Sequence, residues 1–80
     1  MIIEKTVYMD NAHMYITVKQ LSVNPKYRLF IHLLDYDTKH DAHHTEDFDT
    51  FDEAVSVLDE KIELVWIRYM WKHGLEKYYQ

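Results

Sequence analysis

The sequence predicts an α+β domain in which a three- to four-stranded antiparallel sheet precedes one long C-terminal helix. Three observations support this. The 80 residues suffice for one core. Apolar and polar residues alternate at period two through the first half of the chain. A capping signal then opens a helical pattern near residue 50. We therefore expect one domain over 1–80, with the sheet in 1–49, the helix in 50–74 and a tail in 75–80.

The first two strands are predicted from β-forming residues and from alternation. Residues 2–9 are rich in such residues and predict the opening strand. Residues 13–21 alternate, so Met14, Ile16 and Val18 share one face.

The middle of the chain predicts the most apolar strand and leaves a fourth strand open. Asn24 and Pro25 predict a turn before it. In residues 27–36, apolar side chains occupy both faces, which is typical of a central strand. Residues 43–48 would return as a short fourth strand, which β-propensity supports poorly.

The helix start is the clearest local signal. Thr50 and Glu53 fit a capping box, in which Thr50 accepts from the Glu53 backbone N–H and Glu53 reaches back. The helical pattern continues to His73, and Gly74 is then the expected residue after the helix end. Such a helix spans ~35 Å, whereas strands of eight residues span ~27 Å. The helix should therefore extend beyond its sheet.

The second half of the predicted helix is apolar nearly all round. A core stripe at helical spacing runs from Phe51 to Tyr69, and residues 64–71 add a second apolar face. This surplus must be covered, either within the chain or by a second copy or a partner. The residues expected at such an interface are Leu64, Trp66, Ile67, Met70 and Trp71.

The net charge of −5 is concentrated in the middle of the chain. Residues 35–63 hold eleven acids against Lys39 and Lys61. This segment would repel nucleic acid and attract a basic surface. It is either a solvated face or a docking surface for a basic partner. The acids expected to bind that partner are Asp35, Asp37, Asp41, Glu46 and Asp47.

Catalytic and metal chemistry find little support in the sequence. The absence of cysteine excludes disulfides, thiol catalysis and zinc-finger spacings. No nucleotide-binding or nucleophile-elbow motif is present, so we expect no enzyme and no cofactor. His40, His43 and His44 are metal-capable, but neighbouring strand residues point to opposite faces, so a solvated cluster is favoured over a metal site.

The strand-to-helix junction at Glu46–Ala54 resembles that of two groups of small proteins. HicB-type antitoxins are similar in their strand order and in their acidic, capped helix start, although the glycine- and proline-rich third strand of that family is absent here. Small phage anti-CRISPR proteins resemble it in their sheet, aspartate-rich junction and helix. The phage resemblance implies a stoichiometric inhibitor of a host nucleic-acid-processing complex.

The sequence therefore favours a non-enzymatic binding protein. We expect an inhibitor, plausible for a phage or mobile element, whose acidic surface occludes a basic nucleic-acid-binding site on a host partner. The alternative is a homodimeric regulatory or structural module of the antitoxin kind, and a histidine-rich metal-binding protein comes third. The opening residues MIIEKTVY lack a signal-peptide pattern, so we expect a cytoplasmic protein.

Overall fold

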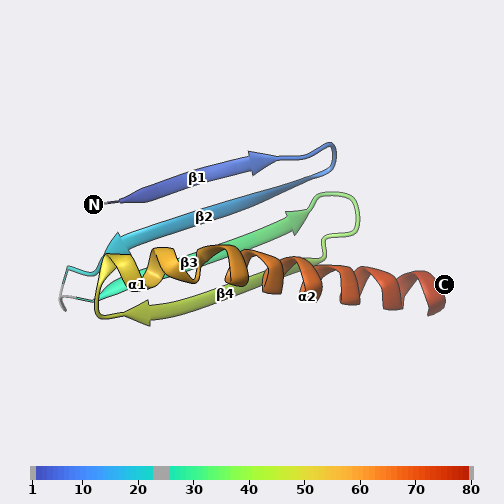
Figure 1. Ribbon diagram of the computed structural model, residues 1–80. Coiled ribbons are helices and arrows are strands. Elements are labelled where there is room, and N and C mark those ends of the chain that lie inside the picture. Colours follow the sequence, from blue (N-terminus) through green and yellow to red (C-terminus); the bar gives the residue numbers. More distant parts are fainter. Residues whose placement is uncertain (1, 23–25, 80) are drawn as a thin grey trace.

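The computed structural model describes residues 2–22 and 26–79, with side chains described up to His73. It confirms the α+β fold, a four-stranded antiparallel sheet followed by a helical segment (Figure 1). The turn predicted at Asn24 and Pro25 lies outside the described residues. The elements are β1 (Ile3–Tyr8), β2 (Ala12–Gln20), β3 (Tyr27–Asp35), β4 (Asp41–Phe48), α1 (Phe51–Ser56) and α2 (Leu58–Tyr79).

The sheet is a simple meander in the order β1-β2-β3-β4. Each strand pairs antiparallel with the next, and Ile16 of β2 lies opposite both Lys5 of β1 and Ile31 of β3. The fourth strand, left open by the sequence, forms over Asp41–Phe48 and pairs with β3 along its whole length. β1 and β4 are therefore the two edge strands.

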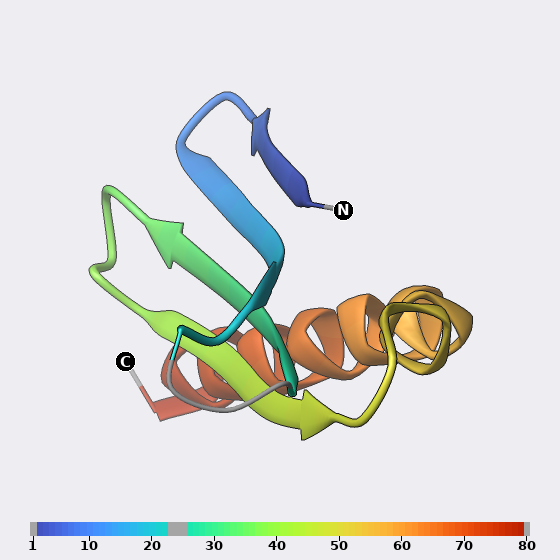
Figure 2. The same ribbon diagram turned by 90° about the vertical axis from the view of Figure 1, so that its left-hand side faces the viewer.

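The core lies on one face of the sheet, which the helices cover. The faces predicted from alternation are confirmed, because Met14, Ile16, Val18, Leu29, Ile31 and Leu33 are all buried. They pack with Ala42 of β4 and with Ala54 and Val65 of the helices. Figure 2 shows α2 lying across β3 and β4 while the β1–β2 hairpin stands away from it. Within the described chain, no helix covers the opposite face of the sheet.

The helical segment differs from the predicted single helix in two places. It is interrupted at Val57, which ends α1, and α2 starts at Leu58. Just before the interruption, the Ser56 hydroxyl donates to the Glu53 backbone carbonyl at 2.7 Å, a local bond that bends helices. The prediction that the helix ends at His73 was wrong, because α2 continues through Gly74 to Tyr79. Glycine in a helix costs only about 1 kcal/mol relative to alanine, so it does not force an end.

The helix start agrees with the sequence, and the helical segment extends beyond the sheet as expected. Thr50 accepts from the Glu53 backbone N–H at 3.2 Å. The Thr50 hydroxyl also donates to the Glu53 carboxylate at 3.3 Å, so the return contact is between side chains. The 22 residues of α2 span ~33 Å. Its last turns project past the β3–β4 hairpin, as Figure 1 shows.

Candidate functional site

Of the five acids predicted to bind a partner, Asp35 is a structural residue. Its side chain is 1% exposed, so the prediction that it contacts a partner surface was wrong. One carboxylate oxygen accepts from the backbone N–H groups of Asp37 and Thr38, at 2.9 and 3.1 Å. The other accepts from the Tyr69 hydroxyl at 2.5 Å. Asp35 therefore shapes the β3–β4 turn and ties it to α2.

The Asp35–Tyr69 contact shifts the titration of both groups. The Tyr69 hydrogen bond, assisted by the N–H of Thr38, lowers the pKa of Asp35 from 3.8 to about 2, although burial acts against the charge. The same bond, together with burial, raises the pKa of Tyr69 from 10.0 to about 12. The pair is thus a charged carboxylate bound by a neutral phenol across the neutral pH range.

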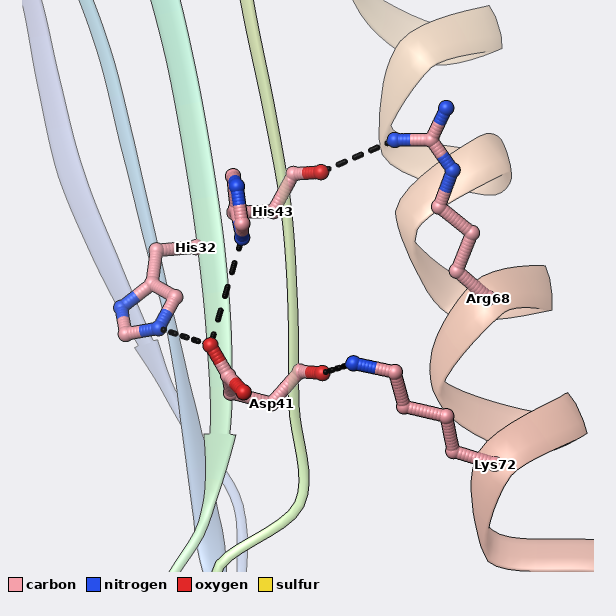
Figure 3. Close-up of polar contacts among 5 residues, drawn as sticks. All are labelled: His32, Asp41, His43, Arg68 and Lys72. Atoms are coloured by element: carbon pink, nitrogen blue, oxygen red, sulfur yellow. Dashed lines mark hydrogen bonds and ion pairs between the residues drawn. The ribbon is translucent and has the colours of Figure 1, made fainter.

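Asp41 lies at the start of β4 and is bound by two histidines of the open sheet face. Its Oδ2 is 3.2 Å from His32 Nε2 and 4.0 Å from His43 Nδ1. Figure 3 shows the three side chains converging while Arg68 and Lys72 reach β4 from the helix. The carboxylate is half-exposed and lies on the open face of the sheet.

Glu46 and Asp47 of β4 are also held within the chain. Glu46 lies 2.9 Å from His44 Nε2 and 3.4 Å from Lys61 Nζ, and these contacts lower its pKa, the His44 bond most. Asp47 accepts a two-pronged bond from Arg28 at 2.9 and 3.1 Å. This bond lowers the pKa of Asp47 and raises that of Arg28.

The last of the five predicted acids, Asp37, has no charged partner among the described residues. Asp37 is exposed and accepts a 3.3 Å bond from the Asn11 side-chain amide. The five acids also point to different faces, because β4 residues alternate across the sheet. The structure therefore does not bring them together into one free acidic surface.

Four further acids without a charged partner lie on the helices. Asp52, Asp59, Glu60 and Glu63 are exposed and form no ion pair with any other described residue. Asp59 and Glu63 lie about one turn apart on the outer face of α2, whereas Asp52 lies on α1, before the interruption at Val57. Sequence reasoning assigned Asp52 to the helix start and counted the other three acids only as part of the acidic middle segment.

Beyond these acids, the outer face of α2 becomes apolar. Ile67, Met70 and Trp71 are 56%, 64% and 69% exposed; we call these three residues the helix patch. The other two residues expected at an interface differ from them. Leu64 is half-buried, and Trp66 packs against the core with its ring 6.0 Å from that of Tyr69.

A groove runs between the helix patch and the edge of β4. It encloses about 440 Å³ and has a largely apolar floor. Its lining residues, which define what we call the β4 groove, are Ala42, His43, Ile67, Arg68, Trp71 and Lys72.

Two cations of α2 cross this groove to the edge of β4. Arg68 donates to the His43 backbone carbonyl at 2.9 Å, and Lys72 donates to the Asp41 carbonyl at 2.7 Å (Figure 3). Neither cation pairs with a carboxylate among the residues that the structure describes. The groove therefore combines apolar walls with positive charge that is not neutralised.

The histidine cluster is dispersed by the fold. His43 is exposed on the open sheet face, whereas His44 lies on the helix side and contacts Glu46, as strand alternation requires. His40 lies in the β3–β4 turn, and the centroid of its ring is 6.3 Å from that of the His73 ring. In residues 2–22 and 26–79 we found no group of three or more side chains placed to hold a metal ion.

Comparisons with known proteins found no relative, so the function is argued from the geometry of the chain. No protein-family model, curated protein or solved structure matches the chain. Among the described helices, none is both long and apolar enough to cross a membrane.

Proposed function

We propose that the chain is a non-enzymatic protein-binding module that contacts its partner through the helix patch and the β4 groove. One observation carries the proposal: three large apolar side chains on consecutive turns of α2 are more than half exposed. Single exposed apolar residues are ordinary, but a contiguous group beside a groove is typical of an interaction site.

The composition of this surface also fits a protein interface. Trp, Met and Arg are enriched at interfaces, and Trp and Arg dominate their binding energy. Here Trp71 lines the β4 groove together with Ile67, Arg68 and Lys72. Glu60 and Glu63 line a hollow together with Ile67 and supply a charged rim to the patch.

The proposal is tested by comparing three baits in a capture experiment. The wild-type chain, an Ile67→Glu variant and a Tyr8→Ala variant are immobilised and exposed to lysate of the cells that encode the protein. Tyr8 is the matched control, because it is 77% exposed but lies on β1. We expect the wild type and Tyr8→Ala to retain the same species and Ile67→Glu to lose it. Equal capture by all three baits would refute the helix patch as the contact surface.

A second candidate function is occlusion of a basic surface on a nucleic-acid-processing partner. It is favoured by the free acids of the outer helix face rather than by the β4 acids proposed from sequence. The resemblance of the Glu46–Ala54 junction to anti-CRISPR proteins supports the same class of partner. Asp59→Lys with Glu63→Lys should then weaken capture and reduce its dependence on salt. Capture by the double variant that matches wild type at low salt would eliminate this candidate.

A further inference from the structure

We infer that the β4 groove binds an acidic segment of the partner protein, in which large apolar side chains lie beside two carboxylates about one helical turn apart. This inference rests on the proposed function, because it names the chemistry of the partner for the same surface. It is carried by two cations of the groove, Arg68 and Lys72, which the backbone of β4 holds in place without neutralising them.

The two cations are positioned by backbone carbonyls and keep most of their hydrogen-bonding capacity. Arg68 donates to the His43 carbonyl at 2.9 Å, and Lys72 donates to the Asp41 carbonyl at 2.7 Å. Each of these bonds uses one donor, whereas a guanidinium has five N–H donors and an ammonium has three. An anion that binds here therefore meets side chains that are already ordered, which lowers the entropic cost of binding.

The chain itself supplies no carboxylate to these cations among its described residues. The Asp41 side chain turns to the open face of the sheet, where its Oδ2 is 3.2 Å from His32 Nε2 and 4.0 Å from His43 Nδ1. Figure 3 shows that only the backbone carbonyl of Asp41 meets Lys72. A partner seated on the groove would remove water from both cations, which is costly unless that partner brings the opposite charge.

An apolar row runs beside the cations. Ile67 and Trp71 are one helical turn apart, and so are Arg68 and Lys72. Together with Ala42 they line a groove of about 440 Å³, a volume typical of ligand sites. A matching segment needs apolar side chains against the first row and carboxylates against the second. Acids at positions i and i+4 of a helix, with Cβ atoms ~6 Å apart, have that spacing.

The positive charge is local, which favours a short acidic segment over an extended polyanion. On the other side of Ile67, Glu60 and Glu63 line a hollow of about 200 Å³ with Lys61, whose charge is paired with Glu46. Nucleic acid or an anionic membrane is negative over a long surface, so it would also meet these acids and the net charge of −5. A short segment avoids them, and their repulsion confines it to the β4 groove.

The first experiment titrates the wild-type chain with helical peptides of about 16 residues by isothermal titration calorimetry. One peptide carries Glu-Leu-x-x-Glu-Leu and the other Leu-Glu-x-x-Leu-Glu, so that the two rows are presented for parallel and for antiparallel docking. We expect one of them to bind. Glutamine in place of both glutamates should weaken binding by roughly 10-fold, and alanine in place of both leucines by at least ~10-fold.

Two results of this titration overturn the inference. One is the failure of both peptides to bind at millimolar concentration. The other is equal binding of the glutamate peptide and its glutamine counterpart. Neither comparison needs a variant of the protein, so loss of folding cannot obscure the result.

The second experiment assigns the contact to the two cations. Arg68→Gln with Lys72→Gln should bind the glutamate peptide as weakly as the wild type binds the glutamine peptide, because the same pairs are lost from either side. Lys19→Gln with Lys26→Gln is the matched control, since it removes the same charge from lysines that pair with surface acids elsewhere. Equal losses in both double variants would trace binding to net charge and overturn the inference.

The outcomes separate this inference from the proposed function. If neither peptide binds but capture by the bait still depends on Ile67, the inference falls and the proposed function stands with a partner of other chemistry. If all three baits capture equally, the proposed function falls and this choice of partner falls with it. A single-stranded oligonucleotide or phosphatidylserine vesicles that bind more tightly than the peptides, through Arg68 and Lys72, would also overturn the choice of a protein segment.

Discussion

Replacing Tyr69 with phenylalanine tests whether the buried contact between the β3–β4 turn and α2 holds the fold together. The change removes one hydroxyl and leaves the ring in place. Asp35 keeps the backbone donors on one oxygen, but its second oxygen loses the Tyr69 bond. A carboxylate that is 1% exposed has little access to water as a replacement. The variant therefore leaves a charged acceptor partly unsatisfied.

The expected changes in the pKa of Asp35 and in Tm follow from the causes of the Asp35 pKa shift. Because the Tyr69 bond is the largest cause that lowers the pKa of Asp35 to about 2, its loss should raise that pKa toward 3.8. Loss of a charge-assisted hydrogen bond in a domain of this size should lower Tm by roughly 5–10 °C at neutral pH.

The pH dependence has a defined sign. A carboxyl whose folded pKa is depressed contributes stability above its unfolded pKa, and this contribution is lost as pH falls. The difference in Tm between the wild type and Tyr69→Phe should therefore be complete above pH ~4 and largely gone near pH 2. Tyr69 acts in the opposite direction, because its folded pKa is raised to about 12. The wild type should accordingly also lose stability as pH rises from 10 to 12.

The assay combines thermal unfolding by circular dichroism with carboxyl-carbon NMR titration of Asp35. Asp35→Asn serves as the control, because Tyr69→Phe should have a smaller effect once the charge is absent. The reasoning is refuted if Tyr69→Phe and wild type have equal Tm at pH 7. It is equally refuted if the Asp35 pKa is unchanged in the variant.

The remaining predictions concern the helix start, the β4 acids and the two tryptophans. Thr50→Ala should reduce the free energy of unfolding by about 1 kcal/mol, measured by urea unfolding; no change would exclude the cap. Glu46→Lys should lower Tm by at least ~5 °C, since it removes two internal ion pairs, whereas Asp37→Lys should leave Tm unchanged. Trp66→Ala should reduce the free energy of unfolding by about 2 kcal/mol or more, whereas Trp71→Ala should leave the stability of the monomer nearly unchanged. Equal effects of the two changes would contradict the burial of Trp66 and the exposure of Trp71.

The strands were predictable because period-two alternation directly reports which side chains share a face. Met14, Ile16 and Val18 are buried as that pattern required. The limits of the helices were not predictable by the same means. The interruption at Val57 coincides with a bond from a side-chain hydroxyl to the backbone, and Gly74 is accommodated within α2.

The predicted acidic surface is dispersed in the structure, because composition counts charges without assigning their partners. Arg28 and Asp47 are nineteen positions apart and meet only because β3 and β4 pair in one register. Asp35 and Tyr69 are thirty-four positions apart and meet only because α2 lies over β3. The helix patch was easier to foresee, since helical spacing shows a surplus of apolar residues before any tertiary contact is known.

Two cations of α2 protect the exposed edge of β4. An open strand edge invites uncontrolled pairing, and here Arg68 and Lys72 occupy two backbone carbonyls of that edge. Arg68→Ala with Lys72→Ala frees both acceptors, so we expect faster formation of thioflavin-positive aggregates under agitation than for wild type. Lys19→Ala with Lys26→Ala removes the same charge, but these lysines pair with surface acids elsewhere. If both double variants aggregate at the same rate, net charge rather than occupied carbonyls protects the edge.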